Sequence, residues 1–126
     1  MCVKVLLAED AESMRKAIRA LLNECEDITL VGEAATFSEA VQKAEELLPD
    51  EIILDLHMVD GAKQHLPAGP KLLAISFAND DEAKASAGRM GAAKLLDKMK
   101  LSQELIPAIL ELAEVRTPVD SLVDIT

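Results

Sequence analysis

An apolar run that ends on a carboxylate is the feature that most constrains the fold of this chain. In the stretch 51–61, EIILDLHMVDG, strand-forming residues lead directly into Asp55, and a polar loop ending in glycine follows. A short apolar run bounded by turn signals is typical of a strand buried on both faces, as in a parallel α/β sheet. Asp55 is therefore expected at the carboxyl end of a strand, where open α/β sheets bind their ligands.

Strand and helix patterns alternate along the whole chain. The predicted strands are Val3–Ala8, Ile28–Val31, Ile52–Asp55, Lys71–Ile75 and Ala92–Leu96. Connections too long for hairpins predict a parallel sheet, and right-handed crossovers place helices on both of its faces. A chain of 126 residues fits one such domain.

Apolar residues at three- and four-residue spacing predict the helices between these strands. The first helix has its apolar face from Met14 to Cys25, and the second follows a turn at Gly32–Thr36, where Thr36 and Glu39 have capping-box spacing. A third helix is expected from a cap at Asn79 or Asp80 to about Arg89, with Gly91 as its stop. The last helix is expected over Ser102–Val115, with Pro107 near its start or at a kink.

The segment between the third and fourth strands is the least regular part of the pattern. His57–Pro70 contains two glycines and two prolines, so only a short helical turn, over Ala62–Leu66, is expected there.

Charge and composition argue against several classes of protein. The 23 acidic and 13 basic residues give a formal charge of −10, which repels nucleic acid phosphates and anionic lipid, so no direct binding to DNA or membranes is expected. Cys2 and Cys25 are too few for a disulfide framework or a cysteine metal site. No apolar run has the length of a membrane span, and no signal peptide is apparent. The expectation is a soluble, cytoplasmic protein.

Acidic, hydroxyl or basic side chains follow four of the predicted strands. Glu9 and Asp10 follow the first strand, Asp55 ends the third, Ser76 follows the fourth and Lys98 follows the fifth. Three carboxylates at one edge of a sheet need a counter-charge, and Mg²⁺ prefers such oxygen ligands. A lysine and a hydroxyl suit phosphoryl oxygens. The pattern predicts a site for a phosphoryl group on or beside Asp55.

Four motifs in chain order are similar to those of the receiver domains of two-component response regulators. They are VLLAED (5–10), IILDLHM (52–58), IS (75–76) and GAAKLLDK (91–98), and the resemblance extends from residue 3 to about residue 115. Residues 1–115 are accordingly read as a receiver domain, and 116–126 as a tail or the stub of a linker. The sequence VGEAA (31–35) also resembles receivers that precede helix-turn-helix output domains.

This resemblance implies a flavodoxin-like, doubly wound sheet of five parallel strands in the order 2-1-3-4-5. It implies that Asp55 accepts a phosphoryl group from a histidine kinase or phosphotransfer protein, and that Lys98 and Ser76 hold the phosphoryl oxygens. The domain would catalyse only its own phosphorylation and dephosphorylation, as a monomer or weak homodimer that acts on an output domain or partner protein. The implied Mg²⁺ ligands are Glu9 (directly or through water), Asp10, Asp55 and the backbone carbonyl of His57.

Several residues depart from the family pattern. Val59 stands where the family has proline, and Gly61–Ser76 is about two helical turns short, so the third family helix is expected to be shortened or irregular. Phe77 replaces a small residue and can restrict access to Asp55, Leu95 replaces an aromatic residue, and Met99 replaces a proline.

These departures leave a second function open, that of a pseudo-receiver that binds proteins without being phosphorylated. A phosphatase acting on a separate substrate is disfavoured, because His57 rather than an aspartate stands two residues after Asp55. Taken singly, Asp55 can be a loop-capping aspartate and Lys98 a surface lysine. The prediction depends on all the strand ends together.

Overall fold

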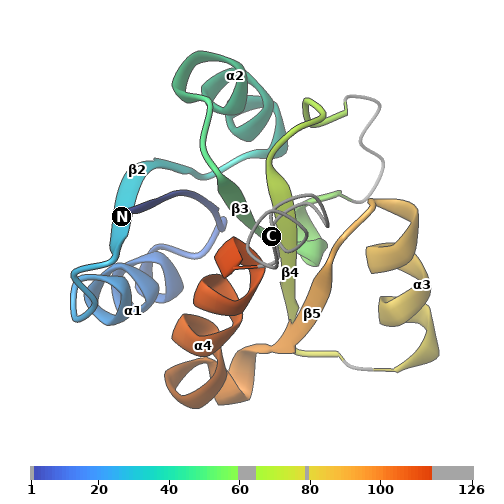
Figure 1. Ribbon diagram of the computed structural model, residues 1–126. Helices are drawn as coiled ribbons and strands as arrows, with labels where there is room; N and C mark the ends of the chain where they lie inside the picture. The colour runs from blue at the N-terminus through green and yellow to red at the C-terminus, as the bar shows by residue number, and fades with distance from the viewer. Residues whose placement is uncertain (1, 60–64, 79, 115–126) are drawn as a thin grey trace, which may run out of the picture.

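The computed structural model of the protein describes residues 2–59, 65–78 and 80–114. Figure 1 shows strands and helices alternating along this part of the chain. In chain order the elements are β1 (Val3–Ala8), α1 (Glu12–Leu22), β2 (Ile28–Ala34), α2 (Phe37–Leu47), β3 (Glu51–Asp55), the 3-10 helix η1 (Leu56–Val59), β4 (Lys71–Ser76), α3 (Asp81–Arg89), β5 (Lys94–Asp97), the 3-10 helix η2 (Lys98–Lys100) and α4 (Leu101–Glu114).

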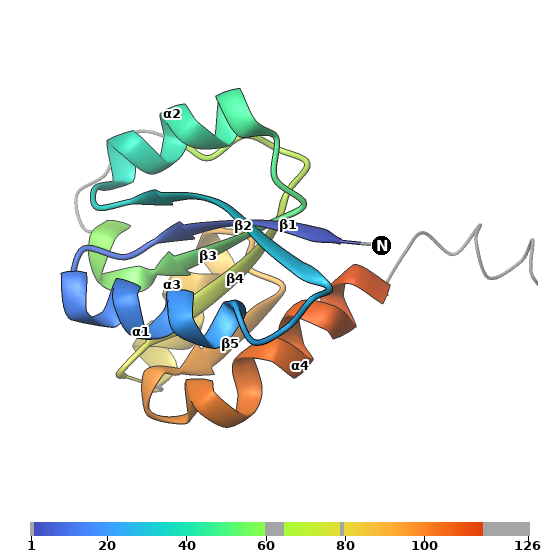
Figure 2. The ribbon, with the colours of Figure 1, turned by 90° about the vertical axis from the view of Figure 1, so that its left-hand side faces the viewer.

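The strands form one parallel sheet in the order β2-β1-β3-β4-β5, which confirms the predicted topology. Figure 2 shows α1 and α4 on one face of this sheet and α2 on the other. Helix α3 covers the second face beside β5, where its Ala83 and Ala87 pack with Ala74 and Leu56. Such two-sided covering is what right-handed crossovers produce.

All five residues of β3 are buried: the apolar Ile52–Leu54, as the sequence predicts, and also the acids Glu51 and Asp55. Its side chains alternate between two cores, because successive residues of a strand point to opposite faces. Ile53 packs in the cluster under α1 and α4, and Ile52 and Leu54 pack in the cluster under α2. The burial of β3 on both faces fixes the position of Asp55 at its carboxyl end.

Strand β2 is longer than predicted, so the expected turn at Gly32–Thr36 is wrong for its first three residues. After an irregularity between Val5 and Leu6, β1 continues to pair with β2 as far as Ala34. Glu33 is held in place because Arg19 of α1 donates two hydrogen bonds, of 2.6 and 2.8 Å, to its carboxylate. Gly32 also allows α2 to approach, since a Cβ there would lie 2.7 Å from Cδ1 of Leu47.

The helix caps agree with the sequence patterns. Thr36 Oγ1 accepts a hydrogen bond from the backbone N–H of Glu39, and Asp80 Oδ1 accepts one from that of Ala83. Gly91 follows α3 with a φ of 77°, a conformation that glycine adopts without strain.

Other boundaries differ from the predicted ones. β5 begins at Lys94 rather than Ala92, because Ala92 N–H still bonds to the carbonyl of Ala87 as part of the turn after α3. Helix α4 begins at Leu101, and Pro107 lies in its middle, on the exposed side, rather than near its start.

In its described parts, 56–59 and 65–70, the connection between β3 and β4 has little regular structure, which agrees with the prediction of a shortened or irregular third helix. The 3-10 helix η1 follows Asp55 directly, and 65–70 are not helical. The predicted turn over Ala62–Leu66 falls partly on 62–64, outside the described residues, and is wrong for His65 and Leu66. A cavity of about 240 Å³ lies beside this segment, between Leu66, Pro70, Arg89 and Met90. Among the described helices, none is long and apolar enough to cross a membrane.

Truncating the side chain at the centre of β3 tests how much this burial contributes to stability. Ile53 is 0% exposed. We expect Ile53→Ala to lower the free energy of unfolding by about 2–5 kcal/mol and Ile53→Val by about 0.5–1.5 kcal/mol, measured by denaturant titration. The matched control is Thr29→Ala, at the exposed position of the edge strand β2, expected to stay within about 0.5 kcal/mol. A loss below about 1 kcal/mol for Ile53→Ala contradicts the assignment of β3 to the core.

Candidate functional site

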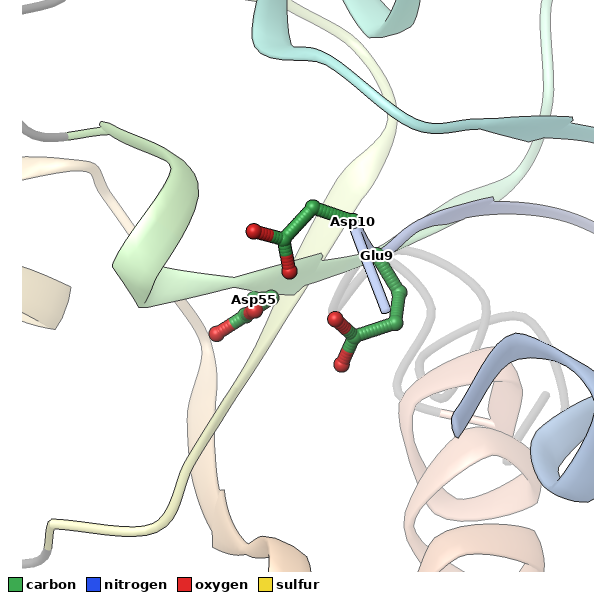
Figure 3. A group of neighbouring side chains, drawn as sticks. All are labelled: Glu9, Asp10 and Asp55. Carbon is green, nitrogen blue, oxygen red and sulfur yellow. The ribbon is translucent and has the colours of Figure 1, made fainter. Parts of the chain in front are cut away.

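The carboxyl ends of β1 and β3 bring three acidic side chains together. Glu9 and Asp10 follow β1, and Asp55 ends β3, the strand that pairs with it. Figure 3 shows the three carboxyl groups gathered at the strand ends. One oxygen of each lies within 4.8 Å of those of the other two. Glu9 is 0% and Asp55 2% exposed, whereas Asp10 is exposed. The predicted convergence of these strand ends is therefore observed.

Lys98 joins this cluster from the end of β5. Its Nζ lies 2.7 Å from Oε1 of Glu9 and 3.0 Å from Oδ2 of Asp55, and its side chain is only 6% exposed. The Phe77 ring lies beside it, with 5.0 Å between its centroid and Nζ. Lys98 is thus a buried cation between two buried carboxylates and not a surface lysine.

Backbone N–H groups orient the two buried carboxylates. Oδ1 of Asp55 accepts a hydrogen bond of 3.0 Å from the N–H of His57, and Oε2 of Glu9 accepts one of 3.0 Å from the N–H of Ala11. In both cases the donor lies two residues further on, as in a local side-chain turn. The second oxygen of each carboxylate is the one that faces Lys98.

Arg15 supports the site without belonging to the cluster. Its Nη1 donates to the carbonyl oxygens of Glu9 (2.8 Å) and Asp10 (3.2 Å), and so holds the β1–α1 loop. In the sequence, Arg15 is one of several charged residues between the apolar positions of the first helix. No local signal reveals that its guanidinium reaches back to the loop, because that depends on how α1 packs.

The cluster retains more negative than positive charge. Burial raises the pKa of Glu9, although the hydrogen bond from Ala11 and the contact with Lys98 oppose this. A side-chain hydrogen bond with Glu9 lowers the pKa of Asp10 and so favours its charged form. Burial disfavours the charged form of Lys98, but Glu9 and Asp55 more than offset this and raise its pKa.

A hard divalent cation fits this arrangement. Three carboxylates face one lysine, so a single ammonium does not neutralise them. Carboxylate oxygens are the ligands that Mg²⁺ prefers. The three carboxylates therefore supply the kind of oxygen donors that Mg²⁺ binds.

Ser76 and His57 lie at the same edge of the sheet. Ser76 ends β4, one residue after Ile75, the register partner of Asp55. Its Oγ accepts a hydrogen bond of 3.0 Å from the N–H of Ala78, which leaves its hydroxyl hydrogen to donate. The side chain of His57 is exposed, and its backbone contributes the N–H that holds Asp55.

The residues that depart from the family pattern surround this edge. Phe77 is 61% and Met99 76% exposed, so both present apolar surface near Lys98. Leu95 is partly buried against the small core under α3. Asp97 shapes the turn after β5, because its Oδ1 accepts a hydrogen bond of 2.9 Å from the N–H of Met99.

Comparisons with known proteins agree on one family. The family model described as response regulator receiver domain matches residues 5–110. The response regulator protein VraR of Staphylococcus aureus is 41% identical over 90 residues, which are 65% of this chain and 43% of that protein. VraR of Staphylococcus epidermidis is 40% identical over the same lengths. The aligned part therefore spans less than half the length of these relatives.

Solved structures show the same fold. The signal receiver domain of the putative response regulator NarL from Mycobacterium tuberculosis has a TM-score of 0.78 and 26% identity, covering 91% of this chain and 98% of that one. The response regulator domain of Thermotoga maritima CheB has a TM-score of 0.75 and 22% identity, covering 92% and 99%.

Removing the lysine tests the electrostatic balance of the cluster. Lys98→Met leaves buried carboxylates without their cation, so we expect a loss of about 3–5 kcal/mol of unfolding free energy at neutral pH. Adding Glu9→Gln to Lys98→Met should recover part of it, because one buried charge is removed. The control Lys100→Met, at an exposed position of η2, should change little. Equal stability of Lys98→Met and Lys100→Met in denaturant titrations contradicts the buried ion pairs.

Proposed function

We propose that this chain, which belongs to the family of response regulator receiver domains of two-component systems, is a phosphoacceptor module phosphorylated on Asp55. The donor is a histidine kinase or a phosphotransfer protein, and the reaction takes place in the cytoplasm. The observation that carries the proposal is Lys98 held between Glu9 and Asp55 beside Asp10. A lysine and three carboxylates at the carboxyl ends of strands in one sheet are suited to the formation of an aspartyl phosphate.

Phosphorylation forms one bond and breaks one bond. An Asp55 carboxylate oxygen attacks the phosphorus in line, while the bond from phosphorus to the donor histidine nitrogen breaks and its electron pair stays on that nitrogen. The product is an acyl phosphate on Asp55. In dephosphorylation, water attacks the phosphorus and the Asp55 carboxylate leaves, which releases inorganic phosphate.

The residues around Asp55 are assigned separate roles in this reaction. The N–H of His57 fixes Oδ1, so attack comes from the side of Oδ2, where Lys98 lies. Lys98 exchanges its contact with Oδ2 for one with a phosphoryl oxygen, and the Ser76 hydroxyl donates to another. Glu9, Asp10, Asp55 and the backbone carbonyl of His57 would hold Mg²⁺. When bound, Mg²⁺ neutralises charge on the phosphoryl oxygens.

The phosphorylated state is proposed to act on an output domain or partner protein. The relatives of this chain are longer than the matched part, which is consistent with an attached or separate output. By the family resemblance, phosphorylation of Asp55 is reported by Ser76 to the face formed by α3, β5 and α4. The report corresponds to a shift between two packings of that face.

A second candidate, a pseudo-receiver that binds proteins without phosphorylation, is favoured by one observation. Phe77 and Met99 expose apolar surface at the edge of the site. The ring of Phe77 lies against Lys98, so it can restrict the approach of a donor to Asp55. The buried and paired Lys98 favours the phosphoacceptor, because a protein-binding surface has no need of it.

Incubation with acetyl phosphate and Mg²⁺, followed by intact mass measurement, separates the two candidates. We expect the wild type to gain the mass of one phosphoryl group, and Asp55→Asn to gain none. Glu45→Gln, on the exposed side of α2, is the matched control and should behave as wild type. If the folded wild type gains no mass although it binds Mg²⁺, the pseudo-receiver is the correct reading.

Shortening Phe77 tests its role at the site. We expect Phe77→Ala to speed both phosphorylation by acetyl phosphate and loss of the phosphoryl group by roughly 2–10-fold, because water and donor reach Asp55 more easily. Phe77→Leu retains bulk but lacks the aromatic face, and should stay closer to wild type. If Phe77→Leu matches Phe77→Ala, or both react more slowly, the ring acts by holding Lys98 and not by blocking access.

A further inference from the structure

A second buried carboxyl group lies at the opposite end of β3 from Asp55. Glu51, the first residue of β3, is 1% exposed. Among the described residues, neither of its carboxylate oxygens has a hydrogen-bond partner. A buried carboxylate without hydrogen bonds is strongly disfavoured as an anion. The proposed phosphoryl chemistry makes no use of this group.

The sheet register places Glu51 under α1 and α4. Its partners are Val5 on β1 and Lys71 on β4. Val5 and Ile53, which share this face, pack in the core cluster with Leu22 of α1 and with Ile109 and Leu112 of α4. Apart from Lys71, the residues named on this face are apolar, so the carboxyl group of Glu51 lies in apolar surroundings.

Few charged or titratable groups interact electrostatically with Glu51. The charges that act on it are the cation of Lys71 and the anion of Asp50, whose Oδ2 accepts a hydrogen bond from the N–H of Lys4. Cys25, after α1, is partly buried against the same cluster. On α4, Glu111 is paired with Lys94 of β5 at 2.9 Å. Lys71 is the only cation that acts on Glu51 among the described residues.

Lys71 is engaged with the end of α4. Its Nζ donates a hydrogen bond of 2.5 Å to the carbonyl oxygen of Leu112. The last four carbonyls of a helix have no partner within the helix, and a lysine there also compensates the negative end of the helix dipole. Lys71 thus links the sheet to the last turn of α4.

We propose that Glu51, Lys71 and the Leu112 carbonyl form a proton-controlled latch on the last turn of α4. When Glu51 is neutral, Lys71 remains on the carbonyl of Leu112 and the turn is held to the sheet. When Glu51 is ionised, its carboxylate attracts the ammonium group of Lys71 and draws water to this end of the sheet. The hydrogen bond from Lys71 to the carbonyl of Leu112, which ties the last turn of α4 to the sheet, is then weakened.

The latch responds close to neutral pH. Burial raises the pKa of Glu51 to about 7 from an ordinary value of 4.5, while Lys71 opposes the shift and Asp50 adds to it. Below pH 4.5 the carboxyl is neutral whether the turn is closed or open, so pH has no effect there. Between pH 4.5 and 7 the closed form binds one proton more than the open form, so the free energy by which Glu51 favours the closed form falls as the pH rises. Above about pH 7 this contribution of Glu51 is fully lost.

One helix connects this latch to the candidate phosphorylation site. Helix α4 begins directly after η2, which carries Lys98, and its last turn is the one that Lys71 holds. The latch itself does not require phosphorylation of Asp55. If the proposed function holds, the state of the site acts on the same helix as the latch.

Hydrogen exchange of the α4 amides between pH 6 and pH 8 tests the latch, with rates corrected for intrinsic exchange. In the wild type, Glu51 has a pKa of about 7 in the closed form and 4.5 in the open form. The equilibrium constant for opening of the last turn should therefore rise about tenfold between pH 6 and pH 8. Glu51→Gln is neutral at every pH and should show no rise. Glu114→Gln, an exposed position in the same turn, should retain the full rise.

Two results would overturn the latch. One is an equal pH-dependent rise in Glu51→Gln and the wild type. The other is a rise of the same size at the amide of Ile53, which indicates global unfolding. Carboxyl-carbon NMR titration of Glu51 provides an independent readout, with an expected midpoint near 7, and a midpoint near 4.5 contradicts the proposal. Neither measurement depends on phosphorylation, so failure of the latch and failure of the phosphoacceptor function are distinguishable.

Discussion

The ion contacts of Lys98 with Glu9 and Asp55 depend on three strands being held in one register. β1 and β3 are neighbours in the sheet, and β5 lies beyond β4, so the lysine must reach across β4 to the two acids. Burial of β3 on both faces and the covering helices fix that geometry. A buried cation between buried anions is stable only where the distances are short, and here they are 2.7 and 3.0 Å.

The buried acids at the two ends of β3 lie in different surroundings. At the carboxyl end, Asp55 has an N–H donor and a lysine, which suits the anion that the proposed phosphoacceptor must be. At the amino end, Glu51 has neither a hydrogen bond nor a close ion pair with any residue that the structure describes, which suits a group that holds a proton. Helix α4 runs between these regions, so two chemically distinct events can act on one element.

Much of the fold followed from local pattern. The alternation of strands and helices gave the parallel sheet, the caps at Thr36 and Asp80 marked two helix starts, and the residues at the strand ends identified the cluster. The end of β2 was missed because Gly32 suggests a turn, whereas the strand is extended by pairing with β1 and by the contact between Arg19 and Glu33. Such contacts join residues distant in the chain, so periodicity does not reveal them.

The same limit applies to Glu51 and Arg15. A glutamate beside Asp50 before an apolar run suggests a polar strand start, and only the register with Val5 and Lys71 shows that its side chain lies in the core. Arg15 looked like one more charge on a helix surface until the packing of α1 brought it to the loop after β1. Both are cases in which tertiary structure, and not residue type, decides the role.

Asp55 is proposed to be the residue that carries the phosphoryl group. Reduction of the acyl phosphate with borohydride, followed by peptide sequencing in a mass spectrometer, locates the modified residue directly. The arrangement of Glu9, Asp55 and Lys98 predicts that the reduced residue is Asp55 in protein treated with phosphodonor and Mg²⁺, and that untreated protein carries none. Modification at Asp10 or another carboxylate, or none in folded protein, contradicts the claim.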